Sequence, residues 1–475
     1  MTDFAAARKP ADGAATAEDA GSQGPVSPVT RDLSEHIATA LARPLPDDVA
    51  EKAKHHLLDT LAAMVSGSRL TPGRRALAYV RAQGGRRQAT VAGSPFLTSA
   101  QMAALANGMS AHADESDDSH LRGRFHPGCA VVPAALAAAE LADRDGPTLL
   151  RAVALGYDVG ARFVMALGLG KAYGRPHSTH SLGGLFGAAA AAGALLGLDA
   201  RHVRMQLSYA VQQASGLAYW MRDPDHIEKA FDFGGMPARN GVAAATMVAA
   251  GFTGVEDPLS GARTYLEAFA ETPRPEALVE GLGSRFEVMQ AAIKKWSAGA
   301  PIQAALDALD SLMRGHGVEA ADVVCLTVRL PDDRAHLVDD RAVANLCVQH
   351  LLAVLLHDRK LGFAAAHDQA RMRDPAILAL RARIRLVPDA ELTKARPPRQ
   401  AIVEITRRDG RRLVQRTRAV RGTPENPMPR QEVEAKAADL LAPVLGTERT
   451  RALITEIGRI EQLGAVRSLR PLLQA

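Results

Sequence analysis

One segment, the run from Ser181 to Leu198 (SLGGLFGAAAAAGALLGL), constrains the fold of this chain more than any other. The run carries no charge, consists mostly of alanine and glycine, and is followed directly by Asp199. Alanine and glycine enter lipid poorly, so we expect a buried, closely packed helix rather than a membrane span. Aromatic residues make up only 4% of the chain, so its core must consist of small and aliphatic side chains. Such side chains let helices approach closely, which predicts a large helical body.

The spacing of apolar residues changes along the chain. Helical spacing runs from about Asp32 to Thr272. Beyond Glu276 the pattern differs, and residues 324–330 alternate between apolar and polar side chains, as in a half-buried strand. The first part of the chain is therefore expected to be helical and the next part mixed.

The remaining elements predict that the helical body is interrupted by a second domain. An apolar helix over 345–356, a short strand over 383–387 and a hairpin with an Asp409-Gly410 turn come first, and helical spacing returns from Arg430. We therefore expect a mainly α fold, in which a large all-helical domain contains an inserted, smaller α+β domain. The expected segments are a disordered tail (1–30), the first part of the helical domain (31–272), the α+β domain (273–425) and the C-terminal return of the helical domain (426–475).

Charge and cysteine content exclude several classes of protein. The chain has 57 basic and 52 acidic residues, a net charge of +5, and no basic run interleaved with aromatic residues, which argues against nucleic-acid binding. Its three cysteines form no Cys-x-x-Cys pair, which argues against a disulfide scaffold, a structural zinc site and a four-thiolate iron–sulfur cluster. The first thirty residues contain acidic side chains and no apolar run, unlike a signal or transit peptide. We expect a cytoplasmic protein.

The densest polar segment is HADESDDSHLRGRFHPG, residues 112–128. In a cleft, its carboxylates and imidazoles would shift one another's pKa values, and its arginines could hold substrate carboxylates. A solvated acidic loop is the alternative, and a His/Asp metal site is a third interpretation. A calcium loop is disfavoured because serine stands where glycine is needed. The candidate residues of this segment are Glu115, Asp118, Ser119, Arg122, Arg124 and His126.

Three further segments carry groups suited to proton transfer or anion binding. His177 and His180 precede the alanine-rich helix, whose first N–H groups favour an anion, although two incidental histidines near a helix cap are the alternative. Lys229 lies among phenylalanines and glycines, where it could hold a carboxylate or donate a proton, unless it is a surface lysine. The fourth segment, IKKWSAGAPIQAALDAL, carries Lys294, Lys295 and Trp296.

These four segments, in this order, resemble the MmgE/PrpD family. LLDTLAAMVSG near the start and GTPENPMPRQEVEAKAADLL near the end add to the resemblance, which runs from about Leu33 to Leu473. The family includes 2-methylcitrate dehydratase, cis-aconitate decarboxylase and iminodisuccinate epimerase. The resemblance implies a helical domain with a smaller α+β lid domain, a homodimer, and an active site between the two domains that requires no iron–sulfur cluster.

The resemblance also assigns site residues. The family's acidic residue falls on Glu115, its first histidine on His126, its next histidine on His177 with His180 in competition, and its lysine on Lys229. Glutamate instead of aspartate at 115, and serine instead of threonine at 119, are departures from the family pattern. The lid's aromatic residue, often tyrosine, falls on Trp296, which has no phenolic proton to give.

Together these observations predict a lyase of the dehydratase or decarboxylase type that acts on a small di- or tricarboxylate, without metal or cofactor. It would abstract a proton from a carbon next to a carboxylate. The expected catalytic residues are His126, His177, Lys229 and Glu115, and the expected substrate-binding residues are Asp118, Ser119, Arg122, Arg124, His180 and Trp296. Three alternatives stay open: an epimerase or racemase of an amino- or imino-dicarboxylate, a metal-assisted lyase, and a non-catalytic carboxylate-binding protein.

Overall fold

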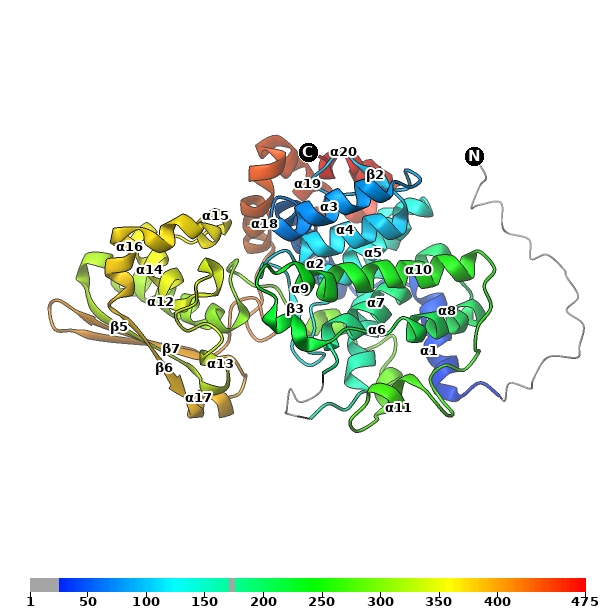
Figure 1. Cartoon of the computed structure of the whole chain (residues 1–475), viewed down its shortest axis with the longest axis horizontal. Coiled ribbons are helices and arrows are strands. Elements are labelled where there is room, and N and C mark those ends of the chain that lie inside the picture. Colours follow the sequence, from blue (N-terminus) through cyan, green and yellow to red (C-terminus); the bar gives the residue numbers. More distant parts are fainter. Residues whose placement is uncertain (1–24, 171–175) are drawn as a thin grey trace, which may run out of the picture. The chain divides into compact units, whose positions relative to one another are not determined.

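The computed structural model describes residues 25–170 and 176–475 and divides them between two compact units (Figure 1). The helical unit comprises the chain up to Ala113, then Asp118–Gln290 and Leu441–Ala475. The mixed unit comprises Asp114–Asp117 and Ala291–Leu440. Of the expected disordered tail, residues 1–24 lie outside the described part, and the first helix begins at Pro28. The other segment bounds and the lid role expected from the sequence stay predictions.

The helical unit is built almost entirely of α-helices. Its strands are three two-residue pieces, β1 (Ala89–Thr90), β2 (Leu97–Thr98) and β3 (Ser119–His120). Its helices are α1 (Pro28–Thr39), α2 (Asp47–Gly67), α3 (Thr71–Gln83), α4 (Ala100–Ala111), α5 (Gly128–Leu141), α6 (Gly146–Met165), α7 (Thr179–Leu196), α8 (Ala200–Gln212), α9 (Ile227–Ala230), α10 (Met236–Ala249), α11 (Tyr265–Phe269), α19 (Thr447–Gly458) and α20 (Arg470–Leu473).

The alanine-rich run forms α7, the central helix of this unit. It packs against α5, α6 and α10, and it is buried on almost every side, as expected of a helix that is apolar all round (Figure 1). Among the described residues it is the one helix long and apolar enough to cross a membrane, and 83% of that window is buried inside the protein. The run is thus a core helix.

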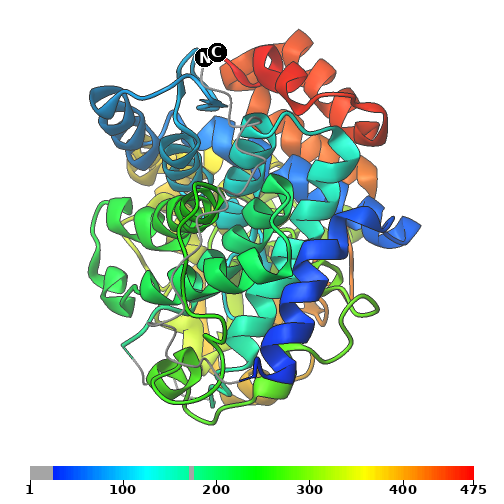
Figure 2. The same ribbon diagram turned by 90° about the vertical axis from the view of Figure 1, so that its right-hand side faces the viewer.

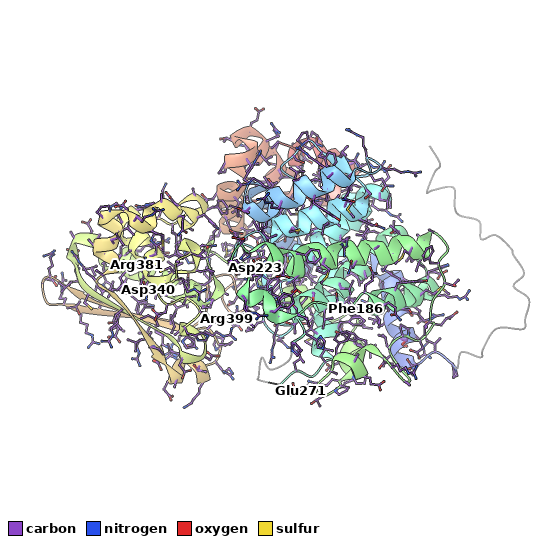
Figure 3. The ribbon with its side chains drawn as sticks, viewed as in Figure 1. Phe186, Asp223, Glu271, Asp340, Arg381 and Arg399 are labelled. Carbon is purple, nitrogen blue, oxygen red and sulfur yellow. The ribbon has the colours of Figure 1, made fainter. Side chains whose placement is uncertain are left out.

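Small residues allow α6 and α7 to approach closely. A Cβ on Gly187 would lie 2.5 Å from the Gly156 carbonyl oxygen, and a Cβ on Gly156 would lie 2.9 Å from that of Gly187. Nearby, Phe163 and Phe186 stack with ring centroids 3.7 Å apart, and Figure 3 shows Phe186 inside this unit. Figure 2 shows α1, in dark blue, along the outside of the unit, where it packs on α8.

The mixed unit contains a four-stranded sheet and a set of shorter helices. Its elements in chain order are β4 (Ala291–Ala292), α12 (Gln303–His316), β5 (Val323–Pro331), α13 (Asp332–Ala335), α14 (Val348–Asp358), α15 (Phe363–His367), α16 (Pro375–Arg381), β6 (Ile384–Asp389), α17 (Ala390–Lys394), β7 (Ala401–Arg407) and β8 (Arg412–Thr417). The strand order is β6-β5-β7-β8, with β5 and β6 parallel and the other pairs antiparallel. The boundary between the two units falls within helix α18 (Arg430–Leu445): residues up to Leu440 belong to the mixed unit, and those from Leu441 belong to the helical unit.

The sheet confirms the strands and the hairpin predicted from the sequence, with one local difference. Leu326, Val328 and Leu330 are buried as the alternation predicts, but Val324 is 52% exposed and Val323 is buried instead. The pairing of β5 with β7 shifts between Val323 and Cys325, which indicates a bulge. A bulge inserts one residue into the strand and reverses the alternation beyond it.

The core of the mixed unit lies between the sheet and the apolar faces of α12 and α14. Away from this core, Asp340 and Arg381 form an ion pair, and both are labelled in Figure 3. The fold is therefore mainly α, with a large helical unit and a smaller α+β unit, as predicted from the sequence.

Candidate active site

Four histidines of the helical unit surround the ring of Phe233, and we call these five residues the imidazole cluster. His112 ends α4, His126 precedes α5, His180 lies in the first turn of α7, and His226 precedes α9. Four separate segments of the chain therefore bring imidazoles to one place.

Phe233 is sandwiched between two of these imidazoles. The His180 ring lies 3.6 Å from the Phe233 ring, centroid to centroid, with 12° between the planes, and the His112 ring lies 4.2 Å away at 18°. One face of a phenyl ring accommodates one stacked partner, so the two imidazoles occupy opposite faces. His126 lies at the edge of the sandwich, 5.0 Å from His112, 5.3 Å from His180 and 5.4 Å from Phe233. His226 extends the group on the far side of His112, at 5.2 Å.

Lys229 and Trp220 complete this group. The Lys229 Nζ atom lies 5.2 Å from the centroid of Phe233 and 5.5 Å from that of Trp220, within the range of a cation–π interaction. The indole of Trp220 meets His180 and Phe233 edge to face, with centroids 5.6 Å and 4.7 Å away. An ammonium group therefore lies beside the imidazole cluster, as required of a group that holds a carboxylate next to a base.

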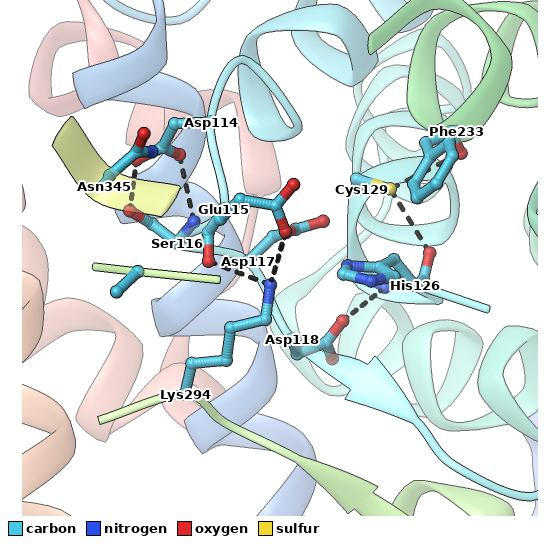
Figure 4. A network of polar contacts seen from close by, with 12 residues as sticks. Asp114, Glu115, Ser116, Asp117, Asp118, His126, Cys129, Phe233, Lys294 and Asn345 are labelled. Atoms are coloured by element: carbon cyan, nitrogen blue, oxygen red, sulfur yellow. Dashed lines mark hydrogen bonds and ion pairs between the residues drawn. The ribbon is translucent and has the colours of Figure 1, made fainter. Parts of the chain in front are cut away.

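The backbone that carries Phe233 has an unusual conformation. Phe231–Gly235 form a π-helical turn, a feature found frequently at functional sites. The turn packs tightly on α4, because a Cβ on Gly234 would lie 2.2 Å from the Gly108 carbonyl oxygen. The Cys129 thiol lies between two carbonyl oxygens, 3.4 Å from that of Phe233 and 3.2 Å from that of His126 (Figure 4). His226 adopts the left-handed φ of 60°, which side chains seldom adopt.

Asp232, next to Phe233, is a buried carboxyl group. It is 5% exposed and accepts a hydrogen bond from the Ser178 hydroxyl, whose oxygen accepts one from the Trp220 indole N–H at 3.4 Å. Burial, together with the negative charge of Glu228, raises the pKa of Asp232 to about 7. This carboxyl group therefore exchanges a proton near neutral pH.

His177 and His180 line one small cavity of about 70 Å³, together with Trp220, Phe269 and Arg124. The His177 ring meets Phe269 edge to face at 4.8 Å, whereas the His180 ring is part of the imidazole cluster. Of the two histidines that the sequence left in competition, His180 is the one that lies beside His126.

Arg122 lines a second, larger cavity in the helical unit. This cavity has a volume of about 470 Å³, and Arg124, Arg274, Arg285 and Glu280 also line it. Arg124 lines both cavities, and its Nη2 donates to the carbonyl oxygen of Gly170 at 2.7 Å. Arg124 therefore lines the same cavity as His180, whereas Arg122 lines only the larger cavity of the two.

Asp118 and Ser119 are both buried. Both carboxylate oxygens of Asp118 accept hydrogen bonds from the chain itself, from His56, Tyr157 and the Gly128 backbone N–H. These bonds tie Asp118 to the first residue of α5, which lies two residues after His126. Ser119, 5% exposed, forms part of β3.

Glu115 belongs to the mixed unit, where it contacts Lys294. The Lys294 Nζ atom donates to the Glu115 carbonyl oxygen at 2.8 Å and lies 3.5 Å from a carboxylate oxygen of Glu115 and 3.5 Å from one of Asp117 (Figure 4). Burial alone would lower the pKa of Lys294, but the charges of Asp117, Glu115 and Asp114 raise it. Lys294 therefore carries a positive charge in a buried acidic setting.

Trp296 lies in the core of the mixed unit and is 6% exposed. Its indole N–H donates to Asp307 at 2.9 Å, so its one polar hydrogen is engaged within the protein.

The sequence reasoning did not single out several residues that the structure places at these positions. His112 is the first residue of the densest polar segment, and Phe233 lies close to Lys229 in the sequence. The sequence predicted no function for either residue. Lys294 was noted only as the neighbour of Trp296. His226 and Trp220 carried no signal of their own, because a single histidine or tryptophan in a loop has no diagnostic spacing.

The chain belongs to the MmgE/PrpD family. The family's N-terminal domain matches residues 31–278, and its C-terminal domain matches residues 296–462.

Curated relatives are named as cis-aconitate decarboxylases. A cis-aconitate decarboxylase-like protein, oryM, of Aspergillus oryzae is 27% identical over 310 residues, covering 62% of this chain and 63% of the relative. The cis-aconitate decarboxylase of Aspergillus terreus is 26% identical over 309 residues, covering 61% of each chain. The human cis-aconitate decarboxylase is 24% identical over 458 residues, covering 91% of this chain and 92% of the relative. The chain thus spans less than two thirds of the two fungal relatives and nearly all of the human one.

Proposed function

We propose that this protein is a lyase that removes a proton from a carbon next to a carboxylate of a small di- or tricarboxylate, and then expels water or carbon dioxide. The observation that carries the proposal is the convergence of His126, His180 and Lys229 around Phe233. Membership in the MmgE/PrpD family and similarity to proteins named as cis-aconitate decarboxylases support the substrate class.

The imidazoles supply the base. A neutral imidazole of His126 or His180 takes the proton from the substrate carbon, and the electron pair of the broken C–H bond moves into the neighbouring carboxylate as an enolate. In a dehydration, this pair returns to form the carbon–carbon double bond as the hydroxyl group leaves, protonated, as water. In a decarboxylation, the carbon–carboxylate bond breaks in place of the C–H bond, and carbon dioxide leaves without the electron pair of that bond. The histidine then starts as an imidazolium, and the pair left on the carbon, or on a carbon conjugated with it, takes the imidazolium proton.

Cationic side chains stabilise the charge that develops. The Lys229 ammonium group lies beside the aromatic rings, in surroundings that strengthen its attraction for a carboxylate. Arg124 lines the cavity next to His180, where its guanidinium could bind a second carboxylate in bidentate fashion. One base and two cations match a substrate that carries at least two carboxylates.

Proton NMR in deuterated water tests the proposal directly. Citrate, 2-methylcitrate and cis-aconitate are incubated with the protein, and each reaction leaves a distinct record. Dehydration gives new vinylic signals from citrate or 2-methylcitrate, decarboxylation gives a product with one carboxylate fewer, and epimerisation exchanges the α-proton without net loss. If no exchange and no product appear with these or other small polycarboxylates that stabilise the protein thermally, the proposal is wrong.

We also propose that the reaction needs no metal or other cofactor, because imidazole and ammonium groups suffice as base and counter-charge. Imidazoles are also good metal ligands, so the test is direct. Turnover should survive dialysis against a chelator and should not rise with added divalent ions. Loss of turnover that zinc or iron restores would favour a metal-assisted lyase.

We further propose that the protein is a homodimer in the cytoplasm. Family resemblance supports the dimer, and the cysteine usage supports a reducing compartment. Light scattering coupled to size-exclusion chromatography measures the mass, which should be twice the chain mass of 50.3 kDa. Fractionation of cells tests the location.

A further inference from the structure

We infer that Phe233 sets the upper size of the group that a substrate can carry on its reacting carbon. The inference rests on the proposed function, because it concerns the same imidazoles. Its basis is the space that the Phe233 ring fills between His112 and His180, with His126 at its edge.

The cavity beside His180 is small. The cavity lined by His177 and His180 measures about 70 Å³, which holds only a few water molecules. A carbon that gives its proton to His126 or His180 must come within hydrogen-bond reach of the imidazole. The His180 ring stacks on Phe233 with the centroids 3.6 Å apart, so a carbon at that distance from the His180 imidazole also lies near the Phe233 ring. A larger substituent on that carbon therefore meets the ring.

The Phe233 ring is held too firmly to move aside for a larger group. The side chain is 2% exposed and has an imidazole stacked on each face. Its backbone is held by the close approach of Gly234 to Gly108 and by the Cys129 thiol (Figure 4). The neighbouring Asp232 is bonded to Ser178, which fixes the same turn from the other side. A rigid wall selects by size, whereas a mobile one adapts to the ligand.

Phe231 provides a matched control in the same π-helical turn. Its ring contacts the Arg239 guanidinium, 5.8 Å from the ring centroid, and no imidazole contact is recorded for it among the described residues. Phe231→Ala removes the same number of atoms from the same turn and leaves the imidazole cluster intact. Phe233→Leu removes less volume than Phe233→Ala, and it tests the same inference if Phe233→Ala does not fold.

The first measurement asks whether space opens where the ring was, without any substrate. Benzene binds rigid apolar cavities left by large-to-small substitutions. Saturating benzene should raise the Tm of Phe233→Ala and leave the wild type and Phe231→Ala unchanged. No effect on a folded Phe233→Ala would mean that the space collapses, which overturns the inference.

The second measurement compares citrates that carry hydrogen, methyl or propyl on a methylene carbon, with affinities obtained by isothermal titration calorimetry. Relative to the wild type, Phe233→Ala should shift the preference towards propyl by about tenfold or more, Phe233→Leu by less, and Phe231→Ala not at all. An unchanged order of affinities overturns the inference. If no citrate binds any variant although benzene stabilises Phe233→Ala, the proposed substrate class is wrong and the space-filling role of Phe233 is supported.

Discussion

The His56 imidazole Nδ1 lies 2.6 Å from the Asp118 carboxylate Oδ2, and both side chains are fully buried. The Tyr157 hydroxyl donates to the same oxygen at 2.6 Å, and the other oxygen accepts from the Gly128 backbone N–H at 3.0 Å. Asp118 therefore joins α2 and α6 to the first residue of α5. His126 stands two residues before that point, so this network anchors the loop that carries it.

Replacing Asp118 with alanine should destabilise the helical unit and disturb the His126 loop. The substitution leaves the Tyr157 hydroxyl, the His56 N–H and the Gly128 N–H without their acceptor, and each buried unpaired group costs about 1–3 kcal/mol. We expect a loss of about 3 kcal/mol or more, measured as a fall in Tm by calorimetry. Asp47→Ala, at an exposed position in the first turn of α2, should change Tm little. Equal effects of the two substitutions would contradict the anchoring role.

Replacing Asp232 with asparagine should change the pH dependence of stability. The pKa of this carboxyl group is raised from 3.8 to about 7, so between these values the native state holds a proton that the unfolded state has lost. Stability contributed by the group therefore falls as pH rises from about 4 to 7, by about 4 kcal/mol at most. The neutral amide avoids this loss, and its oxygen can still accept from the Ser178 hydroxyl.

We therefore expect Asp232→Asn to raise Tm at pH 8 and to leave it nearly unchanged at about pH 3, below both pKa values, where the wild-type carboxyl group is largely protonated in both states. Asp232→Ala removes both the charge and the hydrogen bond to Ser178. Comparing its Tm with that of Asp232→Asn therefore separates the effect of the charge from that of the hydrogen bond. A Tm difference between Asp232→Asn and the wild type that is independent of pH would show that Asp232 is already ionised in the native protein.

Two adjacent lysines of the mixed unit should respond differently to substitution. Lys294 is 4% exposed and faces Glu115 and Asp117, so Lys294→Met removes an ammonium group that pairs with two buried carboxylates. Breaking a buried pair in this way costs about 3–5 kcal/mol. Lys295, whose side chain is 24% exposed, pairs with Asp310, and Lys295→Met should cost about 1 kcal/mol or less.

Calorimetry on the two lysine variants measures this difference as a larger fall in Tm for Lys294→Met. Equal losses for both variants would mean that the Lys294 ammonium group is as well hydrated as that of Lys295.

Much of the fold could be predicted from periodicity, because burial imposes a spacing on each element. The charge-free run 181–198 had to be a buried helix, and the alternation in 324–330 had to be a strand, as α7 and β5 confirm. The bulge that exposes Val324 could not be predicted, because it depends on pairing with β7, which is distant in the sequence. Nor could the sequence show that Asp114–Asp117 belong with the mixed unit, since this depends on contacts with Lys294, His367 and Lys436.

The sequence could identify the segments that contribute to the candidate site, but it could not show how their side chains are arranged in space. His126 and His180 lie in segments marked by clustered polar residues, and Lys229 lies in one marked by its aromatic and glycine neighbours. The structure brings the three side chains together around Phe233. Which of the two histidines, His177 or His180, joins the imidazole cluster depends on where α7 begins. Ser178 precedes its first residue, so His180 falls in the first turn and His177 lies before it, paired with Leu217 in an isolated β-bridge.

His180 should therefore matter more than His177 for turnover. Removing an imidazole that transfers a proton lowers kcat by about 10²–10⁴-fold, whereas removing one that only lines the neighbouring cavity acts mainly on KM. We expect His180→Ala to lower kcat and His177→Ala to act mainly on KM. His202→Ala, at an exposed position on α8, is the control and should stay close to the wild type in both constants. His126→Ala should resemble His180→Ala, and the double variant should lose little more than either single one if both imidazoles serve one proton transfer. Steady-state kinetics with the substrate identified by NMR measures the wild type and all five variants under one set of conditions. A loss of kcat at His177→Ala that exceeds the loss at His180→Ala would reassign the base to the histidine beside Phe269.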